Sequence, residues 1–215
     1  MKIIVIYDNE IHTKEIGLQK DWGFACLIET KHDKILFDTG AKGKILLNNM
    51  KLLNINPKDI TKIVISHEHW DHNGGLKSLS PYVKNIKIYR LSHETQMKNM
   101  RTIIPKIPEK ISEGIWTTGR LKGLVDEQSL VLETNNGCYV LTGCSHPGVD
   151  KILQISKQIG DIVGIIGGFH GFNKFGLVEN LDLICPCHCT AHKKDLKIAF
   201  PNKISDCGAG KIIDI

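Results

Sequence analysis

The feature that most constrains this chain is the regular return of short β-branched runs, separated by glycine-rich turns or by stretches with helical spacing. Runs of this length and composition favour strands over buried helices. Strands that alternate with helices predict a mixed α/β chain. In the first half, the predicted strands span residues 2–7, 24–30, 34–38, 62–66 and 86–91, and the predicted helices span residues 43–53 and 92–100.

The second half shows the same order of elements. The Asn136-Gly137 step predicts a tight hairpin turn between strands at 129–133 and 137–142. A helix at 149–159, strands at 162–166 and 182–185, and a helix at 191–200 are expected to follow. The segment 101–120 contains two Pro and two Gly and no sustained period, which predicts a connection or flap. The repeated order indicates one domain built from related halves at about 1–100 and 121–215.

Length and composition are those of an ordinary globular protein. The 215 residues suit a single domain, and the 41% apolar and 24% charged fractions exclude a disordered or collagen-like chain. Because no apolar stretch has the length of a signal peptide core or a membrane span, a cytoplasmic protein is expected. The formal charge of +5 comes from scattered lysines and favours anionic small molecules mildly. It predicts neither a nucleic-acid nor a membrane partner, and the oligomeric state stays open.

The strongest functional signal is the run SHEHWDHNGG at residues 66–75, directly after an apolar strand. Imidazole and carboxylate groups are common ligands of divalent metals. In an extended segment, His67 and His69 project to one side, Asp71 repeats that spacing, and His72 is expected to turn the other way. Burying these groups without a cation would be costly, whereas an ion offsets that cost. The run therefore predicts a metal site, with His72 able to address a second ion.

Several further motifs lie at predicted strand ends. They are LFDTG at residues 36–40, TGCSHPG at 142–148, GGFH at 167–170 and PCHCT at 186–190. With the pattern His-x-His-x-Asp-His they resemble the metallo-β-lactamase superfamily along most of the chain. Within it, they are similar to a subgroup that includes an archaeal synthase joining a dihydropterin methyl group to ribofuranosylaminobenzene phosphate.

The resemblance implies a four-layer αβ/βα sandwich of two mixed sheets with two divalent metal ions. Zinc is expected, with manganese or iron as alternatives. Carried over position by position, the resemblance implies that one ion is held by His67, His69 and His146 and the other by Asp71, His72 and His188.

Three residues leave alternatives open. The superfamily commonly has a Gly-Asp step where this chain has Gly143-Cys144, so Cys144 is either a bridging thiolate or, as we expect, a small buried core residue. His170 is expected to act on the substrate or beside the ligands, the alternative being a hydrogen-bonded core histidine. Asp38 either accepts a hydrogen bond from a ligand histidine or caps a turn.

Hydrolysis is the expected reaction: a metal-bound hydroxide, oriented by Asp71, would attack an ester, phosphodiester, lactone or similar bond, with His170 or a backbone N–H steadying the developing charge. The alternative is a transferase that couples a dihydropterin diphosphate to ribofuranosylaminobenzene phosphate. Gly171 and Ala191 differ from the residues usual in the subgroup, which ranks the transferase second.

Overall fold

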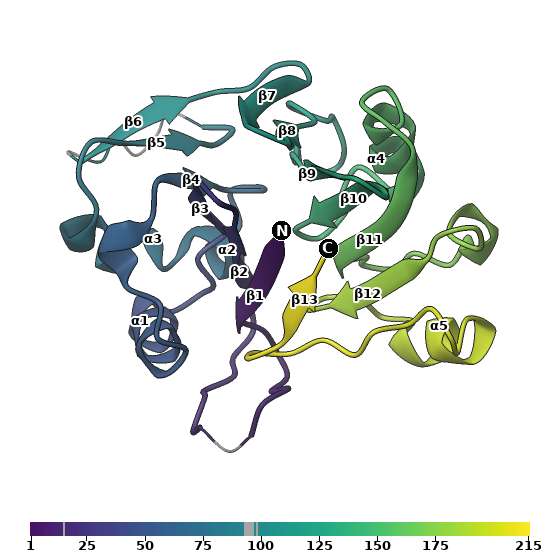
Figure 1. Cartoon of the computed structure of the whole chain (residues 1–215), viewed down its shortest axis with the longest axis horizontal. Helices are drawn as coiled ribbons and strands as arrows, with labels where there is room; N and C mark the ends of the chain where they lie inside the picture. Colours follow the sequence, from purple (N-terminus) through teal and green to yellow (C-terminus); the bar gives the residue numbers. More distant parts are fainter. Residues whose placement is uncertain (15, 93–96, 98) are drawn as a thin grey trace. The chain divides into compact units, whose positions relative to one another are not determined.

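The computed structural model describes residues 1–14, 16–92, 97 and 99–215 (Figure 1). Contacts between Cα atoms divide the chain into two units. Unit 1 comprises residues 1–104 and 207–215, and unit 2 comprises residues 105–206. Each unit contains one β-sheet.

Within the described part of unit 1, the sheet has seven strands. In sheet order they are β13 (Ile212–Asp214), β1 (Lys2–Tyr7), β2 (Ala25–Glu29), β3 (Lys34–Phe37), β4 (Lys62–Val64), β5 (Ile86–Tyr89) and β6 (Met100–Ile103). The first four strands pair antiparallel, and β3 to β6 pair parallel. The helices of the unit are α1 (Gly43–Leu52), α2 (Trp70–Asn73), α3 (Leu76–Leu79) and the 3₁₀-helices η1 (Pro57–Asp59) and η2 (Ser80–Tyr82).

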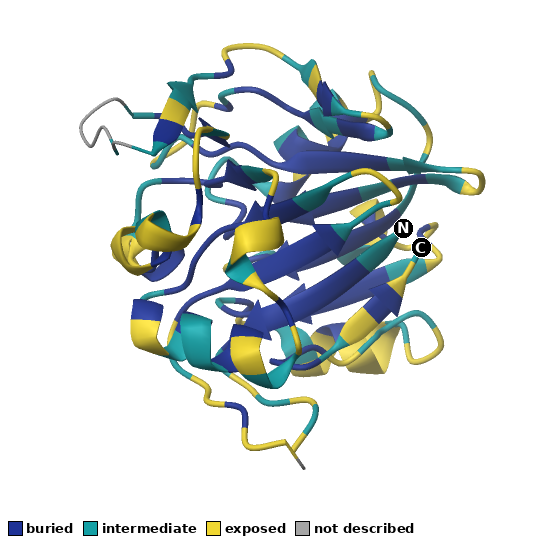
Figure 2. Ribbon diagram, turned by 60° about the vertical axis from the view of Figure 1, so that its left-hand side comes forward, coloured by how far each residue is buried: buried dark blue, intermediate teal, exposed yellow. Residues whose placement is uncertain are grey.

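Helix α1 covers this sheet with an apolar stripe. Leu46 and Met50 are one helical turn apart, both fully buried, and pack in one cluster with sheet residues such as Leu36 and Ile63. Burial of each such side chain contributes roughly 1.5–3 kcal/mol. The strands of β1 to β4 are largely dark blue in Figure 2 because they lie in the core.

The sheet of unit 2 has six strands. In sheet order they are β12 (Leu183–Cys187), β11 (Ile162–Gly168), β10 (Gly137–Thr142), β9 (Leu130–Thr134), β8 (Ile115–Thr117) and β7 (Glu109–Ser112). Strands β10, β11 and β12 are parallel, and the other pairs are antiparallel. Helices α4 (Val149–Ser156) and α5 (Lys193–Ala199) and the 3₁₀-helix η3 (Phe175–Leu177) complete the unit.

Parallel pairing decides where the functional loops lie in each unit. Parallel neighbours end at the same sheet edge, so in unit 1 the loops after β3 and β4 are adjacent. In unit 2 the loops after β10, β11 and β12 are adjacent for the same reason. These loops carry the histidine motifs at residues 66–75, 142–148, 167–170 and 186–190.

Two expectations from the sequence differ from the structure. The segment 101–120 is not simply a connection or flap, because it contains the end of β6 and the hairpin of β7 and β8. Gly114, one of the two glycines of this segment, has a positive φ and forms the turn between β7 and β8. Residues 93–96 and 98 of the predicted helix at 92–100 lie outside the described residues, and Met100 begins β6.

The other predicted elements of both halves are present, with ends shifted by a few residues. No helix among the described residues is long and apolar enough to cross a lipid bilayer.

Candidate functional site

The histidine run of unit 1 folds into a compact cluster after β4. The ring centroid of His67 lies 4.6 Å from that of His69 and 4.1 Å from that of His72. The expectation that His72 turns away is wrong: α2 starts at Trp70, and the His72 N–H donates to the His69 carbonyl at 3.0 Å. This turn replaces the extended alternation and brings His72 back beside His67.

A buried carboxylate supports this cluster from the neighbouring strand end. Asp38 follows β3 with φ +58° and is fully buried. Its oxygens accept hydrogen bonds from the Ser66 N–H at 2.7 Å, the Ser66 hydroxyl at 2.8 Å and His72 Nδ1 at 2.7 Å. Burial raises the pKa of Asp38, while its contacts with His72 and Ser66 oppose that rise. The interpretation of Asp38 as an acceptor for a ligand histidine fits this geometry.

These contacts determine which ring nitrogens carry protons. Ser66 has one hydroxyl proton and donates it to Asp38, so its oxygen accepts from His67 Nδ1 at 2.9 Å. His72 Nδ1 likewise donates to Asp38. When each ring is neutral, this arrangement leaves the lone pair on Nε2, an atom through which imidazole can bind a metal.

Asp71 adds an oxygen donor to the same cluster. Its Oδ2 lies 3.7 Å from His72 Nε2, and the residue is buried. Unit 1 therefore brings together all four of its sequence-predicted ligands, His67, His69, Asp71 and His72.

In unit 2, a residue that the sequence did not single out organises the ligand loop after β10. Glu127 is fully buried. Its Oε1 accepts from the Thr142 hydroxyl and from three successive backbone N–H groups, each at 3.0 Å, while its Oε2 accepts from the His146 N–H at 2.9 Å. One carboxylate thus fixes the backbone of residues 143–146 and the side chain of Thr142.

The loops after β10, β11 and β12 are joined by hydrogen bonds. The Ser145 hydroxyl donates to the Gly168 carbonyl at 2.7 Å, and the Gly168 N–H donates to the Gly143 carbonyl at 3.0 Å. The Phe169 N–H donates to the Thr190 hydroxyl at 3.0 Å, joining the second loop to the third. A Cβ at Gly168 would lie 2.4 Å from the Gly143 oxygen, so glycine permits this approach.

The joined loops gather the chemical groups of unit 2. The ring centroids of His146 and His170 are 5.0 Å apart. The sulfur of Cys144 lies within 4.8 Å of a ring nitrogen of His146 and also of a ring nitrogen of His188. Cys144 is buried. Unit 2 therefore brings its predicted ligands, His146 and His188, around one sulfur.

Left-handed backbone conformations occur at the functional loops of both units. Among described residues other than Gly and Asn, positive φ is found at Asp38 (+58°), Ser145 (+61°), His170 (+48°) and His188 (+44°). Such conformations cost about 1–3 kcal/mol each and persist where surrounding contacts impose them. Their position at the strand ends that carry the predicted ligands is typical of a functional site.

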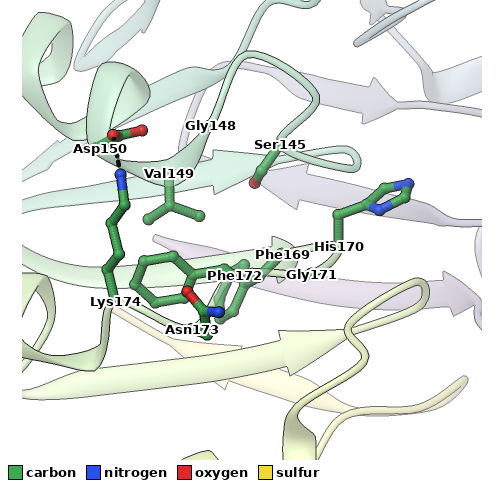
Figure 3. A pocket seen from close by; sticks show the side chains of 10 residues that line it. All are labelled: Ser145, Gly148, Val149, Asp150, Phe169, His170, Gly171, Phe172, Asn173 and Lys174. Carbon is green, nitrogen blue, oxygen red and sulfur yellow. Dashed lines mark hydrogen bonds and ion pairs between the residues drawn. The ribbon is translucent and has the colours of Figure 1, made fainter. Parts of the chain in front are cut away.

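An open pocket of about 240 Å³ lies beside His170 in unit 2 (Figure 3). Figure 3 shows His170 at one end and the ion pair of Lys174 with Asp150, 2.9 Å long, at the other. The rings of Phe169 and Phe172 supply apolar lining. His170 is exposed, so the alternative of a core histidine is wrong. The pocket can hold a small molecule next to an imidazole.

The chain belongs to the metallo-beta-lactamase superfamily, which residues 23–154 match. Its expected resemblance to that superfamily and its fold class, an α/β sandwich fold with two mixed sheets, are thereby confirmed.

Relatives of this chain that are named as enzymes differ in the reactions they catalyse. A 7,8-dihydropterin-6-methyl-4-(beta-D-ribofuranosyl)-aminobenzene-5'-phosphate synthase from Methanocaldococcus jannaschii is 28% identical, with 89% of each chain covered. An N-acyl homoserine lactonase from Bacillus cereus is 28% identical over 54% of this chain and 60% of the lactonase. This chain is thus similar to enzymes of more than one reaction class.

Solved structures agree with this assignment of the fold. Tm1679, described as a metal-dependent hydrolase of the beta-lactamase superfamily, is similar with a TM-score of 0.80 and 25% identity, over 100% of this chain and 99% of that one. The short form of human tRNase Z matches with a TM-score of 0.65 and 14% identity, over 100% and 99% of the two chains, which bears on the fold alone.

Proposed function

We propose that this chain is a metal-dependent hydrolase of small, anionic molecules, acting on an ester, phosphodiester, lactone or similar bond. The observation that carries the proposal is the hydrogen-bond network of Asp38 and Ser66. It turns Nδ1 of His67 toward Ser66 and Nδ1 of His72 toward Asp38, which leaves Nε2 of each ring available to bind a metal. The likeness to Tm1679 supports a hydrolytic role.

The donor set fits two divalent ions, for which zinc is the first choice. Neutral imidazoles and one carboxylate are suitable ligands for zinc, manganese or iron. The proposed ligands of one ion are His67, His69 and His146, and those of the other are Asp71, His72 and His188. When bound, a pair of such ions lowers the pKa of a water molecule and polarises the bond to be cleaved.

The protein's own groups would then orient the reactants. Asp71 is the proposed catalytic carboxylate, since its oxygen beside His72 Nε2 can accept a proton from the attacking water. His170 is the second proposed catalytic residue because its exposed ring borders the pocket. From there it can donate a hydrogen bond to an oxygen that gains negative charge during the reaction.

The proposed setting is the cytoplasm, with a small-molecule substrate and no nucleic-acid or membrane partner. The net charge of +5 is spread over the chain and suits an anionic substrate. Lys174 at the pocket offers a cation to such a substrate, which would replace the exposed Asp150 as the ion-pair partner of Lys174.

A transferase that couples a dihydropterin diphosphate to ribofuranosylaminobenzene phosphate is the second candidate. The identity of 28% to the archaeal synthase over 89% of both chains favours it. The phenylalanines of the pocket would suit a flat ring, and Lys174 would suit a phosphate.

One set of incubations separates the two candidates. The zinc-loaded protein is incubated with a nitrophenyl ester, a bis-nitrophenyl phosphodiester and a lactone, and separately with hydroxymethyl dihydropterin diphosphate and the aminobenzene partner. Release of nitrophenol or opening of the lactone supports the hydrolase. Formation of the coupled product, without hydrolysis, overturns the hydrolase proposal in favour of the transferase.

Substitution and metal analysis test the residues. Asp71→Ala should abolish turnover, lower the metal content and leave the circular dichroism spectrum unchanged, while the exposed Asp59→Asn serves as control. Elemental analysis and anomalous scattering should give two ions per chain, with ligands from both units. Retained turnover in Asp71→Ala, or ions held without His146 and His188, would contradict the proposal.

A further inference from the structure

We propose that Cys144 is itself a metal ligand, whose thiolate is shared between the ion held by His146 and the ion held by His188. This inference rests on the metal-dependent function proposed above. It adds a soft sulfur donor to a site otherwise made of nitrogen and oxygen donors, and none of the six ligands inferred from sequence is Cys144.

The position of the sulfur carries the proposal. It lies within 4.8 Å of a ring nitrogen of His146 and within 4.8 Å of a ring nitrogen of His188. A sulfur at about 2.3 Å and a nitrogen at about 2.1 Å from one tetrahedral zinc are roughly 3.6 Å apart. The same sulfur is thus near enough to each histidine to share an ion with it, and a thiolate has lone pairs for both.

Hydrogen bonds hold the backbone of Cys144 on two sides. The Cys144 N–H donates to Glu127 at 3.0 Å, and its carbonyl accepts from the Cys189 thiol at 3.8 Å. Ser145, the next residue, has φ +61° and makes the turn toward His146. Because the backbone is already ordered, metal binding at Cys144 would restrict only the side chain.

A cysteine on the preceding strand, Cys138, shows the environment of a structural thiol in this unit. Cys138 lies on β10 and is buried like Cys144. Among the described residues, it belongs to no group of histidine, cysteine or carboxylate donors close enough to hold an ion. Burial raises the pKa of the Cys138 thiol, and the nearby negative charges of Glu133 and Asp161 raise it further. Cys138 therefore fits an inert core position, whereas Cys144 has two imidazole neighbours.

Binding would require no reactant other than the metal. The thiol gives its proton to solvent, and the sulfur–metal bond forms with a lone pair of the sulfur, without a change in oxidation state. A shared thiolate also places negative charge between two cations, which reduces their mutual repulsion.

The test uses the full-length chain loaded with Co²⁺ in place of zinc. A thiolate bound to cobalt produces a sulfur-to-metal charge-transfer band in the near ultraviolet, which nitrogen and oxygen ligands do not give. The wild type and the control Cys138→Ser should show this band, and Cys144→Ser should lack it. Cys144→Ser should also bind zinc at least about tenfold more weakly, as expected when a supporting group is removed.

A second variant separates loss of the sulfur from loss of folding. In Cys144→Asp a carboxylate replaces the thiolate, so bound metal should be retained while the band disappears. If the wild type binds cobalt without the band, or if the band persists in Cys144→Ser, Cys144 is not the ligand and the hydrolase proposal stands. If the wild type binds no metal at all, both proposals fail.

Discussion

Replacing Glu127 with glutamine puts an NH₂ group in place of one oxygen of the carboxylate that holds the loop at residues 142–146. Oε1 accepts four hydrogen bonds, from the Thr142 hydroxyl and from the backbone of residues 143–145, whereas Oε2 accepts only from the His146 N–H. The amide oxygen should therefore take the position of Oε1. The amide NH₂ would then face the His146 N–H, donor against donor.

The magnitude follows from these contacts. Breaking one hydrogen bond to a charged group costs roughly 1.5–3 kcal/mol, and the four that remain become neutral and weaker. We expect Glu127→Gln to lower the free energy of unfolding by about 2–4 kcal/mol. Glu127→Ala leaves all five donors without this acceptor, at about 1–3 kcal/mol each, which approaches the whole stability of an ordinary domain.

Urea unfolding of the metal-free protein, followed by circular dichroism, measures this loss. Glu133→Gln is the matched control, because Glu133 faces Lys110 at 4.0 Å and both side chains are partly exposed. Its free energy of unfolding should stay within roughly 0.5 kcal/mol of the wild type. Equal stability of Glu127→Gln and Glu133→Gln would refute the argument that this carboxylate holds the loop.

Two further predictions concern unit 1. Asp38→Asn should weaken metal binding about 10–100-fold, because the amide orients the His72 ring less firmly; competition with a chelator measures this, and unchanged affinity would contradict the role of Asp38. Burial raises the pKa of Tyr7, and the nearby negative charge of Asp21 raises it further. Above about pH 10 the hydroxyl therefore ionises in the unfolded chain but stays neutral in the folded state. As the pH rises from about 10 toward the raised folded pKa, the wild type should therefore lose up to about 1.4 kcal/mol of stability per pH unit relative to Tyr7→Phe. If the unfolding midpoints of the two proteins change in parallel from about pH 8 to 11, the prediction is wrong.

Much of the fold could be predicted from local sequence. The strand at Lys2–Tyr7 has its predicted ends because a continuous apolar run bounded by polar residues leaves little choice. The hairpin of β9 and β10 was equally clear from Asn136-Gly137. The position of His67 at the end of a buried strand pointed to chemistry because several ligand types follow within a few residues.

The rest depends on contacts between residues far apart in the chain. Nothing near Glu127 in the sequence distinguishes it from a surface carboxylate, since its partners are mostly backbone N–H groups that every residue has. The wrong prediction for His72 has a related cause: extended alternation ends before Trp70, where the chain turns into α2. Side-chain types thus indicate which residues of a chain could bind a metal. The tautomer of His67 and the placement of the Cys144 sulfur follow from buried acceptors, Asp38 and Glu127, which only the folded backbone brings to them.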